Sequence, residues 1–243
     1  MASRRYKVKK SAQVAEREDV KEFIESPEVL VEQFSKTEAF FNKNKNLILG
    51  ILGGIILVVG GFLGYRYYVS SQDDIAQREM FQAVFYYEQD SLSQALNGDG
   101  LNFGLLDIIE DYGATEAGNL ARFYAGTIYL KQGEYENAVE YLQAFSSSDL
   151  LVQARAYSLI GDAYMELGNY TNAADNYDRA ADYKPNETIT AQYLMKAALA
   201  FEKQSDYAAA IDRYDEVLTD HFGSPDYQNA KKYKAKLEAL AAQ

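Results

Sequence analysis

The stretch that decides the fold is residues 154–187, which have the sequence ARAYSLIGDAYMELGNYTNAADNYDRAADYKPNE. Small residues and aromatic residues stand at fixed places in it, and the same places recur 35 residues earlier and 37 residues later. The three series are Gly126, Tyr129, Gly133, Tyr135 and Ala138; Gly161, Tyr164, Gly168, Tyr170 and Ala173; and Ala198, Phe201, Ser205, Tyr207 and Ala210. A period of this length predicts stacked copies of one supersecondary unit.

The residue types at these positions predict a pair of helices in each unit. Glycine or alanine at the first position lets two helices pack closely, and Gly133 and Gly168 suit the turn between them. The pattern resembles the tetratricopeptide repeat, a helix–turn–helix of about 34 residues. We therefore expect an all-α solenoid, with repeats at about 119–153, 154–187 and 191–224.

Irregular helices are expected on both sides of the repeats. Apolar residues at helical spacing predict one long helix over 75–96 and a short partner over 101–112. Ser224-Pro225 is a typical helix start, so a capping helix should follow it. Four of its side chains should point inward: Ala230, Tyr233, Leu237 and Leu240.

A run of uncharged residues, LILGILGGIILVVGGFLGY, fills positions 47–65. At about 1.5 Å per residue, a helix of this length nearly matches a hydrocarbon core of roughly 30 Å. The run lies too far from the N-terminus for a secretory signal peptide. The sequence therefore predicts one uncleaved transmembrane helix over 47–69.

Charge predicts the orientation of this span. Lys36, Lys43 and Lys45 precede it closely, and a basic stretch lies at the start of the chain. Arg66 and Arg78 follow at a comparable distance in a segment that is strongly acidic overall. By the positive-inside rule, residues 1–46 form a cytoplasmic arm and residues 70–243 lie on the other side of the membrane. The arm should contain a short amphipathic helix.

Six glycines fall inside the span and lie on one stripe roughly 120° wide when about 100° is assigned to each residue. They are Gly50, Gly53, Gly54, Gly60, Gly61 and Gly64. Such a stripe lets another helix approach closely. The sequence leaves open whether the partner is a second copy or another protein, and whether the glycines only reflect their abundance in membrane helices.

The first helix of each repeat should build the concave face of the solenoid. The expected groove residues are Phe123, Tyr124, Thr127, Lys131, Ser158, Leu159, Asp162, Met165, Met195, Lys196 and Leu199. Apolar side chains with two methionines and few charges suit peptides or unfolded chains. The alternative is that a terminal helix of the same chain fills the groove.

The amino-acid composition argues against a catalytic or metal-binding role. The chain has no cysteine and one histidine, His221, which is expected on the surface. This composition removes most zinc sites and all thiol catalysis. The stretch NGDGLN at 97–102 favours a turn over a calcium loop, and the net charge of −12 argues against nucleic acid. No enzyme, no cofactor and no metal site is expected.

Taken whole, the chain resembles the YfgM-type ancillary subunits of the bacterial Sec translocon. The resemblance rests on FFNKNK at 40–45, the glycine-rich span, GYRYY at 64–68 and Ser71-Gln72. It implies a single-pass protein of the bacterial inner membrane, with a cytoplasmic N-terminus and a periplasmic repeat domain. The implied partners are the SecYEG translocon, a PpiD-like periplasmic chaperone and unfolded client chains.

Two other interpretations stay open. The chain could be a scaffold subunit of another envelope assembly or secretion machine that binds no clients. A mitochondrial import receptor has a similar layout and would reverse the topology.

Overall fold

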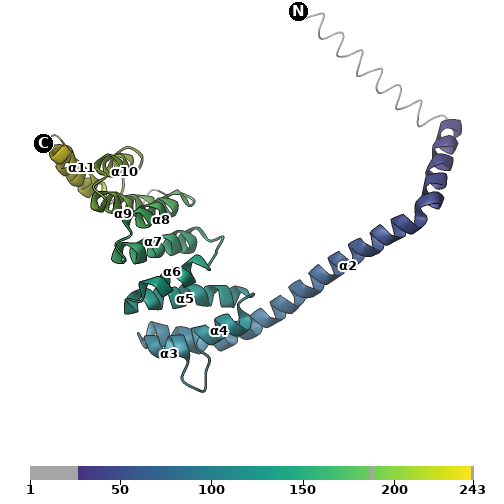
Figure 1. Ribbon diagram of the computed structural model, residues 1–243, viewed down its shortest axis with the longest axis horizontal. Coiled ribbons are helices and arrows are strands. Elements are labelled where there is room, and N and C mark those ends of the chain that lie inside the picture. The colour runs from purple at the N-terminus through teal and green to yellow at the C-terminus, as the bar shows by residue number, and fades with distance from the viewer. Residues whose placement is uncertain (1–26, 187–188, 242–243) are drawn as a thin grey trace, which may run out of the picture. The chain divides into compact units, whose positions relative to one another are not determined.

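The computed structural model describes residues 27–186 and 189–241, and within them every regular element is an α-helix (Figure 1). The helices are α2 (Pro27–Glu88), α3 (Leu92–Asn97), α4 (Leu105–Tyr112), α5 (Glu116–Gln132), α6 (Tyr135–Gln143), α7 (Leu150–Glu166), α8 (Tyr170–Asp182), α9 (Ile189–Lys203), α10 (Tyr207–Asp220) and α11 (Tyr227–Ala241). The all-α prediction is confirmed.

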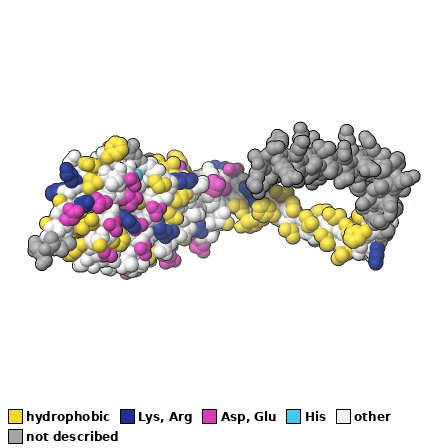
Figure 2. Space-filling model, turned by 90° about the horizontal axis from the view of Figure 1, so that it is seen from above, with side chains coloured by type: hydrophobic (Ala, Val, Ile, Leu, Met, Phe, Trp, Pro, Cys, Tyr) yellow, Lys and Arg dark blue, Asp and Glu magenta, His cyan; other side chains and the backbone are white. Residues whose placement is uncertain are grey.

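Helix α2 contains the apolar run. Its segment Phe40–Glu88 is long and apolar enough to cross a membrane, and none of its most apolar window is buried in the protein. Hydrophobic side chains cover this section in Figure 2. Because α2 begins at Pro27, the expected amphipathic helix and the expected span belong to one helix, while residues 1–26 of the expected arm lie outside the described residues.

The chain forms two compact units, and the boundary between them lies inside α2, between Arg66 and Tyr67. The second unit contains the whole helical array. In the first unit, a Cβ atom added at any of the six span glycines would have no neighbour within 4 Å. In the second unit, Ala76, Met80 and Ala83 of α2 are buried in one cluster with Ala121 of α5. The carboxylate of Asp73 accepts a hydrogen bond from the backbone N–H of Ala117, at 2.8 Å, and so caps α5.

The prediction of one helix over 75–96 is wrong. Helix α2 ends at Glu88, the chain turns through Asp90 with a φ of 57°, and α3 begins at Leu92. This turn brings Ala95 and Leu96 into the same core cluster as Ala76 and Ala83. Burial of these side chains therefore outweighs the local preference for a continuous helix.

The short partner helix, α4, begins at Leu105 and not at residue 101, because a loop around Asp99 precedes it. The Asp99 carboxylate accepts hydrogen bonds from the backbone N–H groups of Leu101 and Asn102 and from the hydroxyl of Tyr86. The bond from the Asn102 backbone, with the others, holds the pKa of Asp99 well below its usual range. Since internal donors already occupy the carboxylate, the turn interpretation of this loop is favoured over a calcium loop.

Three helix–turn–helix pairs follow: α5 with α6, α7 with α8, and α9 with α10, stacked in Figure 1. At each turn one residue has a left-handed backbone: Gly133 (φ 80°), Gly168 (φ 70°) and Ser205 (φ 64°). The next residue donates its N–H to the carbonyl of Tyr129, Tyr164 or Phe201, at 2.9, 2.9 and 3.0 Å. This is the hydrogen bond that closes a helix in the Schellman motif.

Close packing within each pair is set by the first repeated position. A Cβ atom at Gly126 would lie 2.6 Å from the side chain of Leu142, and one at Gly161 would lie 2.6 Å from the ring of Tyr177. Ala198, at the third such position, is fully buried. The second helix of each pair then packs a fully buried alanine, namely Ala138, Ala173 or Ala210.

The capping helix is present, but only half of its expected inward face is buried. Ala230 and Leu237 are buried against the last repeat, whereas Tyr233 and Leu240 are 36% and 45% exposed. Helix α11 begins at Tyr227, three residues after Ser224, because Ser224 closes a turn and accepts a hydrogen bond from the N–H of Asp226.

Substitution Gly161→Ala should destabilise the array. The added methyl group overlaps the ring of Tyr177, and overpacking outweighs the gain in helix propensity, for a net loss of about 1–2 kcal/mol. Urea unfolding followed by circular dichroism measures the change. Lys203→Ala, at an exposed position of α9, is the control, and an unchanged midpoint for Gly161→Ala would show that the contact is not needed.

Substitutions at the turn positions test how much the left-handed backbone costs in free energy. Ser205→Gly should raise the free energy of unfolding by about 0.5 kcal/mol, because it relieves a left-handed backbone at a side-chain-bearing residue. Gly168→Ala should lower it by about 1 kcal/mol, since the new side chain meets open space and only the backbone angle is strained. Thermal melts of the two variants, compared with the unsubstituted chain, test both signs.

Candidate functional site: a cleft over helices α7, α8 and α9

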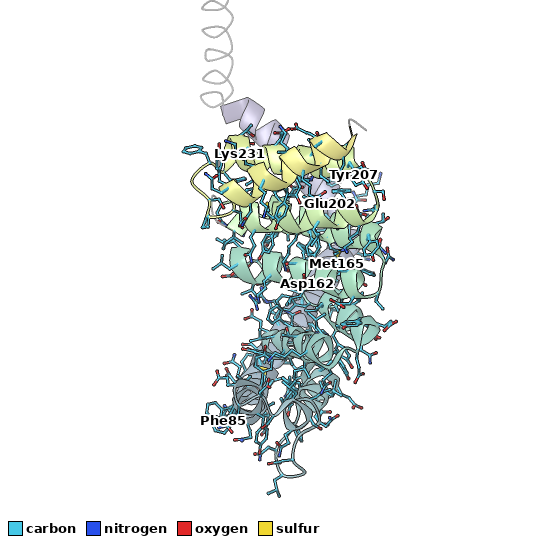
Figure 3. All side chains as sticks on the ribbon, turned by 90° about the vertical axis from the view of Figure 1, so that its left-hand side faces the viewer. Phe85, Asp162, Met165, Glu202, Tyr207 and Lys231 are labelled. Carbon is cyan, nitrogen blue, oxygen red and sulfur yellow. The ribbon has the colours of Figure 1, made fainter. Side chains whose placement is uncertain are left out.

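A cleft of about 390 Å³ lies in the repeat array. Helix α7 supplies three of its side chains, α9 two, and α5, α6 and α8 one each. The lining residues are Leu130, Tyr135, Asp162, Met165, Glu166, Tyr177, Lys196 and Leu199. Figure 3 labels Asp162 and Met165, which lie next to one another on α7.

One wall of the cleft is a closed polar cluster. The Lys196 ammonium donates to both carboxylate oxygens of Asp162, at 2.8 and 3.0 Å, and to the hydroxyl of Ser158, at 3.1 Å. The Tyr177 hydroxyl donates to the same carboxylate at 2.7 Å. The side chains of Lys196 and Asp162 are each about one-third exposed, so this pair ties α7 to α9 at the surface of the cleft.

Burial and the neighbouring Asp162 raise the pKa of the Tyr177 phenol, so this hydroxyl stays protonated and remains a donor. Lys196 also lies 5.4 Å from the centre of the Tyr177 ring, within cation–π distance. The hydrogen bonds of the cluster therefore hold this wall in place. The Ser158 hydroxyl lies beside Lys196, whose ammonium is occupied by the Asp162 carboxylate.

The other wall is apolar and partly open. Leu199 is 45% exposed, and Leu130, Tyr135 and Met165 are half-buried. A flexible thioether beside two leucines and an aromatic ring can adapt to apolar side chains of different shapes. The cleft can therefore take an apolar side chain against this wall, while the polar groups of the opposite wall are already paired with one another.

The structure brings four of the eleven expected groove residues together in this cleft: Asp162, Met165, Lys196 and Leu199. Thr127 and Ser158 are buried and do not line an open surface. Leu159 packs against the core cluster that contains Ile160, and Met195 packs against the cluster that contains Tyr214.

The remaining three residues make other contacts and do not line this cleft. Phe123 packs on Phe145, with ring centres 5.2 Å apart. Lys131 pairs with Asp90 at 3.1 Å. Tyr124 lines a second hollow of about 640 Å³ between α2, α5 and the loop 145–148. Met80 and Leu120 also line this hollow.

Four cleft residues were missed by the sequence reasoning: Leu130, Tyr135, Glu166 and Tyr177. Tyr135 and Tyr177 belong to the second helix of a repeat, which the groove hypothesis did not consider. Their signal was present, because both are aromatic positions that recur along the chain. The period identified them as packing residues and did not show that they also line the cleft.

The expectation that His221 lies on the surface is wrong. It is only 8% exposed, at the end of α10, and its Nδ1 atom has no hydrogen-bond partner among the described residues. Its backbone carbonyl accepts from Ser224 in the turn that leads to α11. Within the described residues, no group of three or more histidine, cysteine, aspartate or glutamate side chains could hold a metal ion.

Comparison with known proteins gives the following findings. Residues 118–188 match one family profile and residues 192–221 match another, and both are described as tetratricopeptide repeat. Superkiller complex protein 3 of Mus musculus is 23% identical over 166 residues, which are 65% of this chain and 10% of that protein. The chain thus spans about a tenth of that relative's length.

The observed fold and the two family profiles lead to the same conclusion about the helix pairs. The stacked helix pairs are tetratricopeptide repeats, an architecture that is generally non-catalytic and serves protein–protein interaction, and they follow one helix that is long and apolar enough to cross a membrane.

Proposed function

We propose that the chain is a non-catalytic adapter, anchored by α2 in the inner membrane of a bacterium and associated with the SecYEG translocon. Its repeat domain lies in the periplasm and acts with a PpiD-like chaperone on chains that emerge from the channel. The observation that carries the proposal is the cleft with one apolar and one charged wall. Support for the particular machine comes from the resemblance of residues 40–72 to the YfgM-type subunits.

The composition of the cleft suits a client without a fixed sequence. Methionine and leucine side chains accept varied apolar groups, and about 390 Å³ is room for one or two such groups. The ammonium of Lys196 and the carboxylate of Asp162 are already paired, so they add little affinity for one particular charged residue. Weak and tolerant binding of this kind is what transient handling of an unfolded chain requires.

Substitution of the apolar wall should weaken client binding. We expect Leu199→Asp and Met165→Asp each to reduce affinity for a permanently unfolded, carboxymethylated test protein by roughly tenfold, through loss of about 1–2 kcal/mol of apolar burial. Fluorescence anisotropy with the full-length protein in nanodiscs measures the change. Lys203→Asp lies on the same helix and outside the cleft, and it should leave the affinity within twofold. Equal binding by all three variants would remove the cleft from the client site.

Topology and partner are tested separately. Protease added to intact spheroplasts should digest the repeat domain, since the charge asymmetry supports a position outside the cytoplasm. A photo-crosslinking residue placed at Leu199 should capture a channel subunit or a PpiD-like chaperone. Protection from the protease would contradict the topology. Capture of subunits of another envelope machine, together with no binding of unfolded chains, would favour a scaffold role instead.

A further inference from the structure

Residues 67–88 of α2 have two opposite faces. Ala76, Met80 and Ala83 are buried against the helical array. The other face carries Tyr67, Phe81 and Phe85, which are 80%, 73% and 43% exposed. Figure 3 shows Phe85 at the outer edge of the fold. An exposed row of aromatic side chains opposite a completed core face is typical of a contact surface.

The exposed face has the spacing of a coiled coil. Positions 67, 74 and 81 form one series and positions 71, 78 and 85 the other, so the steps alternate between three and four residues. The six side chains are Tyr67, Ser71, Asp74, Arg78, Phe81 and Phe85, and all are exposed. We call them the α2 seam. Counted in the sequence alone, the spacing continues back through Gly64, Gly60, Leu57, Gly53 and Gly50.

We propose that the α2 seam pairs with the same seam of a second copy of this chain, with the two helices parallel and in register. A hollow of about 500 Å³ lies on the seam, and it is lined by Asp74, Gln77, Arg78 and Phe81. Residues at i, i+3, i+4 and i+7 form the four-sided hole that receives a side chain from the facing helix. In a parallel pair this side chain is Arg78 of the second copy.

Charge complementarity identifies the occupant. Asp74 and Arg78 make no ion pair within the part of the chain that the structure describes, and they give the seam one charge of each sign. Two-fold pairing places Arg78 of each copy in the hole that contains Asp74 of the other, so two ion pairs form. The seam as a whole is electrically neutral, and each Asp74 offsets the repulsion between the two Arg78 side chains, which face one another in a parallel pair.

Lipid does not cover the aromatic end of this face. Phe81 comes sixteen residues after Tyr65, the last residue of the uncharged run, which is roughly 24 Å of helix. The headgroup layer on one side of a bilayer extends only roughly 5–8 Å beyond the hydrocarbon. Two copies anchored in one membrane point the same way, so membrane insertion itself supplies the parallel order.

Single cysteines test the pairing directly, because the native chain has none. In the full-length protein in native membranes, Ser71→Cys and Phe85→Cys should give disulfide-linked dimers under mild oxidation. Glu79→Cys, exposed but off the seam, should give at least fivefold less. Equal cross-linking at residue 79, or cross-linking only to a different protein, would overturn the proposal.

Charge reversal tests the register. Arg78→Asp should weaken dimerisation in nanodiscs or vesicles, measured by energy transfer between labelled copies, by roughly tenfold. The double variant Asp74→Arg with Arg78→Asp exchanges the signs within each hole and should restore dimerisation to within threefold of the native value. The proposed register would be contradicted by a native protein that stays monomeric, or by a double variant that dimerises as weakly as the single variant. Circular dichroism of each variant serves as the control, and it should show the same helix content as the native protein.

Discussion

The structure depends on the close approach of the two helices within each repeat, which glycine allows in the first two repeats and a fully buried alanine in the third. At Gly161 the ring of Tyr177 occupies the space that a Cβ atom would need, and at Gly126 the side chain of Leu142 does so. Because the ring of Tyr177 lies so close to α7, its hydroxyl reaches Asp162 on the same helix. The contact that packs the repeat therefore also builds the polar wall of the cleft.

Much of the fold could be predicted because the repeat places its strongest signals at positions with strict steric needs. A left-handed turn and a close helix crossing tolerate few residue types, so Gly133, Gly168 and Gly161 carry clear information. The irregular helices before the repeats have fewer positions with such strict steric needs, so their sequence carries less information about where they begin and end. The break at Asp90 comes from burial of Ala95 and Leu96 against α2, a long-range effect that local spacing does not encode.

The candidate site was only partly predictable for a related reason. A repeat register places residues on the first helix of each pair, and it identified Asp162, Met165, Lys196 and Leu199. It does not say how deeply a position is buried, so Thr127 and Ser158 were assigned to an open surface that they do not reach. The second helix contributes Tyr177, which only the three-dimensional packing reveals. Similarly, the burial of His221 follows from the turn between α10 and α11 and not from its own neighbours in sequence.

The bond between Asp73 and the N–H of Ala117 has a mechanical consequence. It joins α2 to the start of α5, where Ala76 and Met80 also pack beside Ala121. A pulling load on α2 would act against this hydrogen bond and this packing at the same time. The junction combines a hydrogen bond with side-chain packing, so α2 and the first helix of the repeats would separate only if both were lost.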